Sequence, residues 1–318
     1  MSAEALEAAA HWGGARHLRL INDRENAVYE AQFPFGRAAL RLHRVGYQTE
    51  TAIRSELWWC AAMAAAGAPV PRPLPARDGE LLHALSSGRM ASVIAWVDGP
   101  EFGKAGVPLP GTATEQADRH RALGDLVAQF HDATDALVLP GWFQRPRWDV
   151  PGLTGDSPFW GRFWDHPALE PAERDILLQA RAHVGATLAA HQAQGGDFGL
   201  VHADVLRENV LLAADGPKLI DFDDAGWGFR VYDLGTMLSQ TLYEPHLPDL
   251  AAALAEGYAA RRPLARDLIP VATLARCCAS VGWAAPRLAA DHPVHRRHIA
   301  RATMLARQVL DGGPDWWR

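Results

Sequence analysis

The chain has 318 residues, of which 48% are hydrophobic and 21% charged, and this composition is typical of a globular enzyme with one large or two modest cores. Its net charge of −6 excludes the basic surface by which nucleic-acid binders are recognised. No apolar run reaches the roughly 18 residues that predict a membrane-spanning helix, and the three cysteines have neither a disulfide pattern nor a zinc-ligand spacing.

The N-terminal third of the sequence alternates short apolar runs with polar or Pro/Gly turns. The first residues lack a basic segment followed by an apolar one, so no secretory signal is predicted and a reducing cytoplasm fits best. The pattern predicts one helix over residues 49–66, which ends before Gly67 and Pro69. Strands are predicted at residues 18–22, 27–33, 38–42, 81–84 and 91–97.

Asp98, Gly99 and Pro100 interrupt this pattern, and we place a domain boundary there, between residues 1–98 and 99–318. Beyond the boundary, apolar positions recur mostly at helical spacing. Helices are predicted at residues 112–136, 171–193, 247–261, 264–289 and 293–310. Among them lies a single predicted strand pair, residues 209–212 and 218–222, joined by an Asp-Gly turn.

The most informative segment of the sequence lies on and just before this strand pair. It contains His202, Asp204 two residues later, Asn209 five residues after that, and Asp221 after twelve more. Asn209 and Asp221 are symmetric about Asp215, so a simple hairpin would place them opposite one another, within roughly 5 Å at Cβ. An amide oxygen and a carboxylate are hard ligands suited to Mg²⁺. Asp204 would orient an acceptor hydroxyl and take its proton during phosphoryl transfer.

The alternative interpretation of the same segment is a strand hairpin whose acidic side chains are merely solvated. Only three asparagines occur in the chain, so this spacing of histidine, aspartate and asparagine rarely arises by chance. The functional interpretation is therefore favoured.

The segment resembles the signature of aminoglycoside phosphotransferases and their relatives, which include choline kinases, bacterial homoserine kinases and a bacterial stress-response kinase. This resemblance implies an α+β, two-lobed, protein-kinase-like fold, with a small antiparallel-sheet lobe that binds ATP and a larger, mostly helical lobe. It also implies Asp204 as the catalytic aspartate and Asn209 and Asp221 as Mg²⁺ ligands. His202 would be structural, and Asp233 would brace the catalytic loop.

The resemblance assigns a cation and its carboxylate partner in the N-terminal lobe, with one departure from the family pattern. Arg41 stands where relatives usually carry lysine, and Glu56 is its expected partner. No lysine precedes Lys104, so none in this lobe replaces it. Arginine binds phosphate through a bulkier planar fork, which leaves open a weaker nucleotide affinity or an altered geometry.

The remaining nucleotide contacts are also implied by the resemblance. The loop at residues 22–29 lacks the glycines of other phosphate loops, but Asn26 and Tyr29 match the family, and Arg24 would help to cover the phosphates. Without the family, the same loop is an ordinary polar turn. Ala95 and Val97 lie where relatives hydrogen-bond adenine through the backbone.

Four functions compete on this sequence. A small-molecule kinase is favoured, because Asp221 is followed by Phe222 and Asp223 where protein kinases have Asp-Phe-Gly. A protein Ser/Thr kinase of the stress-response type and a nucleotide-binding regulator, which the substitution at Arg41 suggests, are the alternatives. A metal-dependent hydrolase is disfavoured, because its Asp-x-Asp motif belongs on an early parallel strand.

The acceptor is expected to be a small polar molecule with a hydroxyl, such as an amino alcohol, a hydroxy amino acid or an aminoglycoside. Acidic and aromatic character alone suggests the pocket residues Asp149, Trp160, Trp164, Asp165 and Tyr243. Asp223 is expected near the metal without ligating it.

Overall fold

The computed structural model describes residues 2–23 and 26–317, which form two compact units. The first unit comprises the chain up to Pro100 together with Ala136–Arg145 and Leu211–Asp223. The second comprises Glu101–Asp135, Pro146–Val210 and the chain from Asp224 onward. The chain therefore returns to its first unit twice, which the division at residue 98 did not anticipate.

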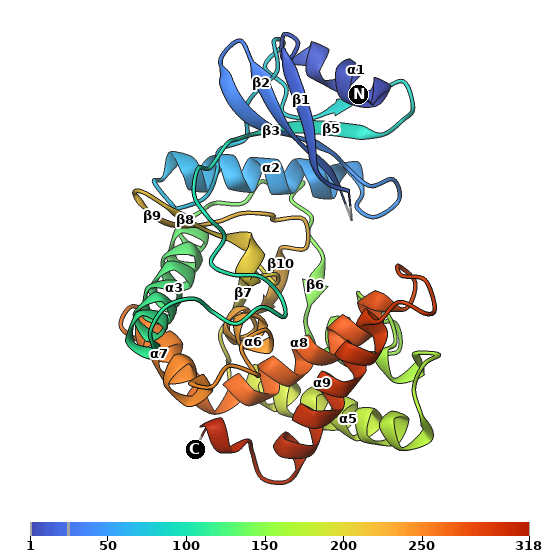
Figure 1. Ribbon diagram of the computed structural model, residues 1–318, viewed down its shortest axis with the longest axis vertical. Helices are drawn as coiled ribbons and strands as arrows, with labels where there is room; N and C mark the ends of the chain where they lie inside the picture. Colours follow the sequence, from blue (N-terminus) through green and yellow to red (C-terminus); the bar gives the residue numbers. More distant parts are fainter. Residues whose placement is uncertain (1, 24–25, 318) are drawn as a thin grey trace. The chain divides into compact units, whose positions relative to one another are not determined.

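The first unit is built on a five-stranded antiparallel sheet with the order β1-β2-β3-β5-β4 (Figure 1). Its elements before the first return are α1 (Ala3–His11), β1 (His17–Asp23), β2 (Ala27–Phe33), β3 (Gly36–Leu42), α2 (Glu50–Ala65), β4 (His83–Ala84) and β5 (Met90–Ala95). The alternating apolar side chains of the inner strands bury one face of this sheet, as a half-buried strand requires.

Helix α1 was missed, and the prediction of a single helix in this unit is wrong. Ala5, Ala8 and Ala9 lie on one face of α1 and are buried, together with Trp12, in the core that includes Leu40 of β3. Small side chains allow the helix to approach the sheet closely. The helix has only nine residues, fewer than the window over which helical periodicity is read in a sequence.

Helix α2 carries Glu56, the expected partner of Arg41. Thr49 caps its first turn by accepting a hydrogen bond from the Ala52 amide at 3.2 Å. Glu56 and Trp59 are buried on its inner face. The hairpin β8 (Val210–Ala213) and β9 (Gly216–Leu219) supplies most of the second return.

The second unit is mostly helical and also contains a three-stranded sheet, so the prediction of a single strand pair is wrong. β10 (Gly226–Phe229) pairs antiparallel with β7 (Phe198–Val201) and parallel with β6 (Arg147–Trp148). These strands are two to four residues long, too short for a period of two to be visible. The helices are α3 (Ala113–Asp135), α4 (Val150–Thr154), α5 (Pro171–Ala193), α6 (Val231–Ser239), α7 (Leu247–Ala259), α8 (Ile269–Ala284) and α9 (Val294–Leu310).

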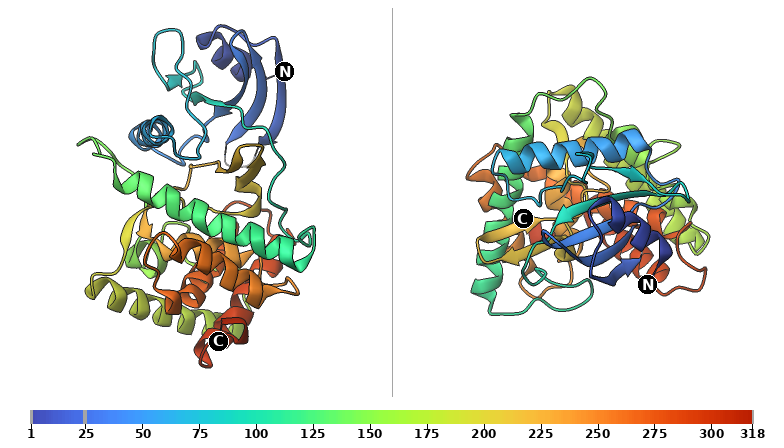
Figure 2. Two further views of the ribbon diagram at one scale, coloured as in Figure 1. Left: turned by 90° about the vertical axis from the view of Figure 1, so that its left-hand side faces the viewer. Right: turned by 90° about the horizontal axis from the view of Figure 1, so that it is seen from above.

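Two helix contacts position the catalytic loop in this unit. Helices α3 and α7 run side by side (Figure 2), and α8 packs against both α6 and α9 (Figure 1). Helix α8 is buried on almost every side, although it contains one charged residue, Arg276. Among the helices of the described residues, none is both long and apolar enough to cross a membrane. The α+β fold class is confirmed.

Candidate active site

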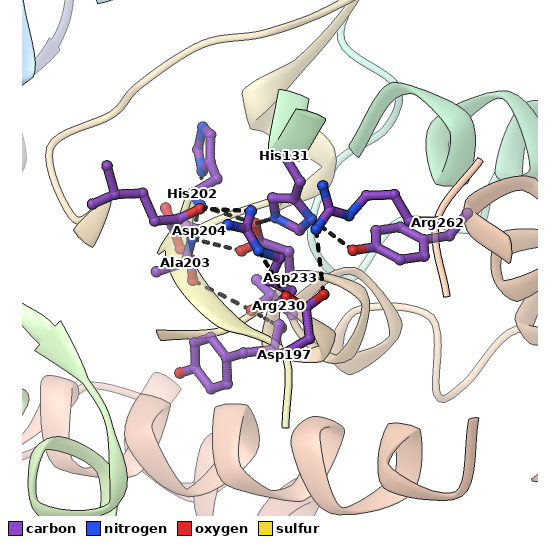
Figure 3. A network of polar contacts seen from close by, with 12 residues as sticks. His131, Asp197, His202, Ala203, Asp204, Arg230, Asp233 and Arg262 are labelled. Atoms are coloured by element: carbon purple, nitrogen blue, oxygen red, sulfur yellow. Dashed lines mark hydrogen bonds and ion pairs between the residues drawn. The ribbon is translucent and has the colours of Figure 1, made fainter. Parts of the chain in front are cut away.

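The catalytic loop begins after β7 and is held in an unusual backbone conformation. Ala203 has a φ of 64°, in the left-handed region that residues other than glycine rarely adopt. Asp233, fully buried in the first turn of α6, accepts hydrogen bonds from the backbone amides of His202 at 2.9 Å and Ala203 at 2.6 Å (Figure 3). This carboxylate therefore stabilises the strained turn that presents Asp204.

His131, on α3, is the third partner of Asp233, and the sequence analysis did not find it. Its Nε2 lies 3.0 Å from Asp233 Oδ2 and its Nδ1 lies 2.9 Å from the Tyr258 hydroxyl (Figure 3). Burial lowers the pKa of His131 despite the neighbouring carboxylate. A neutral ring then donates to Asp233 and accepts from Tyr258. The signal for His131 was its place on the buried stripe of α3, beside Val127.

His202 is buried, and it contacts α3, through the ring of Phe130, as well as α6 and its own loop. Its backbone amide donates to Asp233, and its ring Nδ1 accepts a hydrogen bond from the Asp204 amide at 3.3 Å. These contacts fit the structural role that the resemblance implies for His202.

Both carboxylate oxygens of Asp204 are held by donors from this unit. Arg276 Nη2 donates to Oδ1 at 2.6 Å, and Asn209 Nδ2 donates to Oδ2 at 2.8 Å and to the Asp204 carbonyl at 2.9 Å. The side chain of Asp204 nevertheless keeps 15% of its surface exposed. Asp204 is thus an oriented carboxylate that a ligand can still approach.

Arg276 was not predicted, although the sequence contains a signal for it, since it is the single charged residue within the apolar stretch of α8. Its guanidinium lies 4.5 Å from the ring centroid of Trp160, whose indole Nε1 donates to Asp224 Oδ1 at 3.3 Å. Trp160 therefore joins the surroundings of Asp204 through Arg276.

The other pocket residues suggested by the sequence make contacts elsewhere. Asp149 caps α4 by accepting from the Gly152 amide at 2.9 Å. Asp165 forms ion pairs with Arg162 and Arg174, and Trp164 stacks against Arg181. Tyr243 is 66% exposed.

The predicted pairing of Asn209 with Asp221 across the hairpin is wrong, because both residues flank the strands. The two-residue turn Ala214–Asp215 joins β8 to β9, which moves the centre of the hairpin off Asp215. Asn209 ends a 3₁₀ turn before β8, and Asp221 follows β9 with a φ of 65°. Each residue is therefore positioned by a loop instead of by the ladder.

The donor chemistry of these two residues still suits Mg²⁺. The amide nitrogen of Asn209 is committed to Asp204, which leaves its Oδ1 as the atom that can bind a cation. Asp221 is a second non-glycine residue with a left-handed backbone, a strain typical of functional sites. Over residues 2–23 and 26–317, no group of three or more His, Cys, Asp or Glu side chains could hold a metal. The amide oxygen of Asn209 and the carboxylate of Asp221 are each hard donors of the kind that Mg²⁺ prefers.

Arg41 and Glu56 form the buried ion pair that the resemblance implies. Arg41 Nη1 donates to Glu56 Oε1 at 2.6 Å, and its Nη2 lies 3.6 Å from Asp223 Oδ1. Burial opposes the charge of Arg41, but Glu56, Asp223 and Asp221 together raise its pKa. Arg41 Nε and Nη2 have no hydrogen-bond acceptor among residues 2–23 and 26–317. Phosphate oxygens are acceptors of the kind that a guanidinium binds.

Arg145 joins this cluster from the first return of the chain, and no pattern in the sequence indicates its role. Its Nη1 donates to the Ala52 carbonyl of α2 at 2.9 Å, and its Nη2 donates to the carbonyls of Phe222 at 2.8 Å and Asp223 at 2.6 Å. Its Nη1 also lies 3.7 Å from Glu56. Arg145 therefore ties α2 to the segment that follows Asp221.

The other residues predicted to contact the nucleotide are Arg24, Asn26, Ala95 and Val97. Arg24 lies outside the described residues. Asn26 Oδ1 accepts from the Arg44 amide at 3.0 Å, which organises the loop around it. Ala95 ends β5 with its amide donating to the Arg72 carbonyl, and Val97 follows two residues later.

Comparison of the sequence with known proteins identifies a family and related kinases. A family model described as "Phosphotransferase enzyme family" matches residues 17–268. The homoserine kinase of Agrobacterium fabrum is 30% identical over 208 residues, covering 64% of this chain and 58% of that protein. The chain thus spans less than two thirds of this relative.

Solved structures of kinases share the whole fold. The microcompartment-associated aminopropanol kinase superimposes with a TM-score of 0.83 and 27% identity over 97% of both chains. The amicoumacin kinase hAmiN, in complex with AMP-PNP, Ca²⁺ and Ami, has a TM-score of 0.70 and 19% identity, covering 93% of this chain and 89% of that one. The kinase-like part of the fold prediction is confirmed.

Proposed function

The chain belongs to the phosphotransferase enzyme family and is a kinase, and on this premise we propose that it transfers the γ-phosphate of ATP, with Mg²⁺, to a hydroxyl of a small polar molecule. The relatives named above act on homoserine, aminopropanol and amicoumacin, all small molecules. The nucleotide assignment is supported by the AMP-PNP complex of hAmiN.

The observation that carries this proposal is the fixed carboxylate of Asp204. Donors from Arg276 and Asn209 hold one oxygen each, and Asp233 holds the strained backbone before it. Phosphoryl transfer needs little covalent chemistry from the protein, but it needs a nucleophile in line with the γ-phosphate. A carboxylate of set orientation supplies that alignment.

Asp204 acts on the acceptor hydroxyl during the transfer. The hydroxyl donates a hydrogen bond to this carboxylate, which directs an oxygen lone pair at the γ-phosphorus. As the new P–O bond forms, the bond to the β-phosphate oxygen breaks, ADP leaves with that electron pair, and Asp204 takes the hydroxyl proton. His202 takes no part, because its ring is used within the loop.

Asn209 and Asp221 would hold Mg²⁺, which neutralises phosphate charge when it is bound. Arg41, oriented by Glu56, would bind phosphate oxygens in place of the usual lysine. We assign Arg24, Asn26, Ala95 and Val97 to the nucleotide on the resemblance alone.

The decisive experiment replaces Asp204 by asparagine and measures ADP release with Mg²⁺, ATP and a panel of hydroxyl acceptors. We expect kcat to fall by about 10²–10⁴-fold, the usual contribution of a positioned general base, while ATP affinity changes little. Asp215→Asn is the matched control, because that acid lies in the exposed turn between β8 and β9 and pairs with Lys218. Undiminished turnover by Asp204→Asn would refute the assignment.

A further inference from the structure

Asn209, to which we assign an amide ligand of Mg²⁺, lies at the end of a turn that has little support of its own. It is a single 3₁₀ turn, Arg207–Asn209, and β8 follows it directly. A 3₁₀ turn has poorer hydrogen-bond geometry than an α-helix and occurs in short pieces. The position of the Asn209 side chain therefore depends on the groups that hold this turn from outside.

A buried ion pair holds the first residue of the turn. Arg207 Nη2 lies 2.8 Å from Glu244 Oε1, and the two side chains are 1% and 7% exposed. Arg207 Nη1 also donates to the Val107 carbonyl at 3.1 Å. The Leu109 amide donates to Glu244 Oε1 at 3.2 Å. The pair thus fastens the turn to the segment that precedes α3.

The end of α6 holds the backbone of the same turn. Gln240 Oε1 accepts from the Arg207 amide at 2.8 Å, and its Nε2 donates to Glu208 Oε2 at 3.0 Å. At the other end of α6, Asp233 binds the backbone where the catalytic loop begins. Residues 233–244 therefore brace the catalytic loop at both of its ends, and Glu244 makes the last of these contacts.

Stability does not explain why this contact is charged. Removing two charges from water is costly, and replacing a buried ion pair by apolar side chains of similar volume often leaves a protein equally stable. An ion pair between a guanidinium and a carboxylate is directional, because the two planar groups fit in few geometries. A directional contact is useful where a turn that carries a ligand must be fixed in one place.

We propose that Glu244 is a positioning residue, which fixes the turn through Arg207 so that the amide oxygen of Asn209 can bind Mg²⁺. This inference rests on the proposed function, because it takes from there the metal role of Asn209. Glu244 acts through Arg207 and needs no contact of its own with the nucleotide.

Binding of AMP-PNP, measured by calorimetry with Mg²⁺ and with EDTA, tests this role without turnover. The wild type should bind AMP-PNP more tightly with Mg²⁺. Glu244→Gln keeps the shape of the side chain and removes its charge. It should weaken binding with Mg²⁺ by about tenfold, the lower end of the usual effect of losing a group that orients a metal ligand. Binding in EDTA should stay within about twofold, because no ligand of the nucleotide is removed.

A second variant separates positioning from stability. Arg207→Met combined with Glu244→Met removes both buried charges, so that neither is left unpaired. This variant should melt near the wild-type temperature and still lose the tighter binding with Mg²⁺. Glu256→Gln is the matched control, since Glu256 also pairs with an arginine, Arg121 at 3.2 Å, but at exposed positions. The control should bind AMP-PNP as the wild type does under both conditions.

A double-variant cycle shows whether the effect passes through Asn209. In a protein that already carries Asn209→Ala, the further change Glu244→Gln should weaken binding with Mg²⁺ by less than about twofold, because two residues that act through one ligand are not additive.

The outcomes separate this inference from the proposed function. The role of Glu244 would be overturned, with a kinase left in place, by unchanged binding in Glu244→Gln, by an equal loss with Mg²⁺ and with EDTA, or by a full loss that persists when Asn209 is alanine. Wild-type binding with Mg²⁺ in the double methionine variant would also overturn it. If the wild type did not bind AMP-PNP more tightly with Mg²⁺, the metal assignment in the proposed function would itself fail, and the role of Glu244 with it.

Discussion

At the scale of single residues, Arg145 has the clearest consequence for activity. Its two terminal nitrogens hold three backbone carbonyls, one on α2 and two directly after Asp221. Removing the side chain would leave buried carbonyls unpaired and release the segment that carries a proposed metal ligand. Groups that orient a ligand in this way influence metal affinity without touching the metal.

We predict that Arg145→Met raises the Mg²⁺ concentration needed for half-maximal activity by about 10–100-fold, the usual effect of losing a residue that orients a metal ligand. The acceptor KM should change much less. A magnesium titration of ADP release measures both, and Arg145→Lys should recover part of the affinity. Arg54→Met serves as the control, since Arg54 forms exposed pairs with Glu50 and Glu80. A lowered melting temperature with an unchanged magnesium requirement would show that Arg145 is merely structural.

The sequence identified those site residues that belong to a short motif, or that form a pair found throughout the family. Arg41 and Glu56 were predicted as partners and are in contact. His131, Arg145 and Arg276 were missed because each reaches the site across 72 residues or more. Local patterns contain no information on such distances. The signals visible beforehand were the isolated charge of Arg276 within an apolar helix and the place of His131 on the buried stripe of α3.

At the scale of elements, the contact between α3 and α7 places His131 beside Tyr258, and two glycines allow this contact. A Cβ on Gly124 would lie 2.1 Å from the Leu254 carbonyl oxygen, and one on Gly257 would lie 1.9 Å from the Arg121 carbonyl oxygen. Both distances are far below van der Waals contact, and both opposing atoms are backbone. The helices could accommodate a methyl group only by moving apart.

We therefore predict that Gly124→Ala and Gly257→Ala each destabilise the protein by about 2–3 kcal/mol, the usual effect of overpacking. This occurs even though alanine favours a helix over glycine by about 1 kcal/mol. Denaturant unfolding measures the change. The double variant should be destabilised by less than the two single changes together, because the first already separates the helices. Stabilisation by either substitution would contradict the packing described.

Predictions of helices succeeded for the longer segments and failed for α1, α4 and α6, which have nine residues or fewer. The strand at residues 27–33 and the helix at residues 171–193 were predicted at their observed ends. Helix α6 was missed because its nine residues are fewer than the window over which helical periodicity is read. The predicted register of the hairpin was wrong, because a change of one residue in the length of the turn changes which side chains lie opposite one another.

At the scale of the whole molecule, several histidines are held in the neutral form. Burial lowers the pKa of His43 to about 3, that of His120 to about 4 and that of His298 to about 3. Burial also lowers the pKa values of His131 and His166. In the unfolded chain these residues titrate near 6.5. Their stabilising contribution is therefore fully present above pH 6.5 and is lost as the pH falls toward the folded values.

Asp223 changes the pH dependence of stability in the opposite direction to the histidines. Burial, followed by the charge of Glu56, raises the pKa of Asp223 to about 7. The folded state then binds a proton more tightly than the unfolded state does, so this group gains stability as the pH falls from about 7 toward 4. One carboxyl therefore offsets part of the loss from five histidines.

The histidines prevail in this balance, and we predict that acidification from pH 7.5 to 5.5 lowers the free energy of unfolding by about 2 kcal/mol or more. His43, His120 and His298, whose folded pKa values are about 3 to 4, each lose about 1.4 kcal/mol over this interval, whereas Asp223 returns about 2 kcal/mol. Melting temperatures measured at constant ionic strength test the sign. His120→Gln should flatten the pH dependence, and His246→Gln should not, because His246 is exposed. A melting temperature that rises on acidification would mean that Asp223 dominates and that these histidines can be protonated within the folded protein.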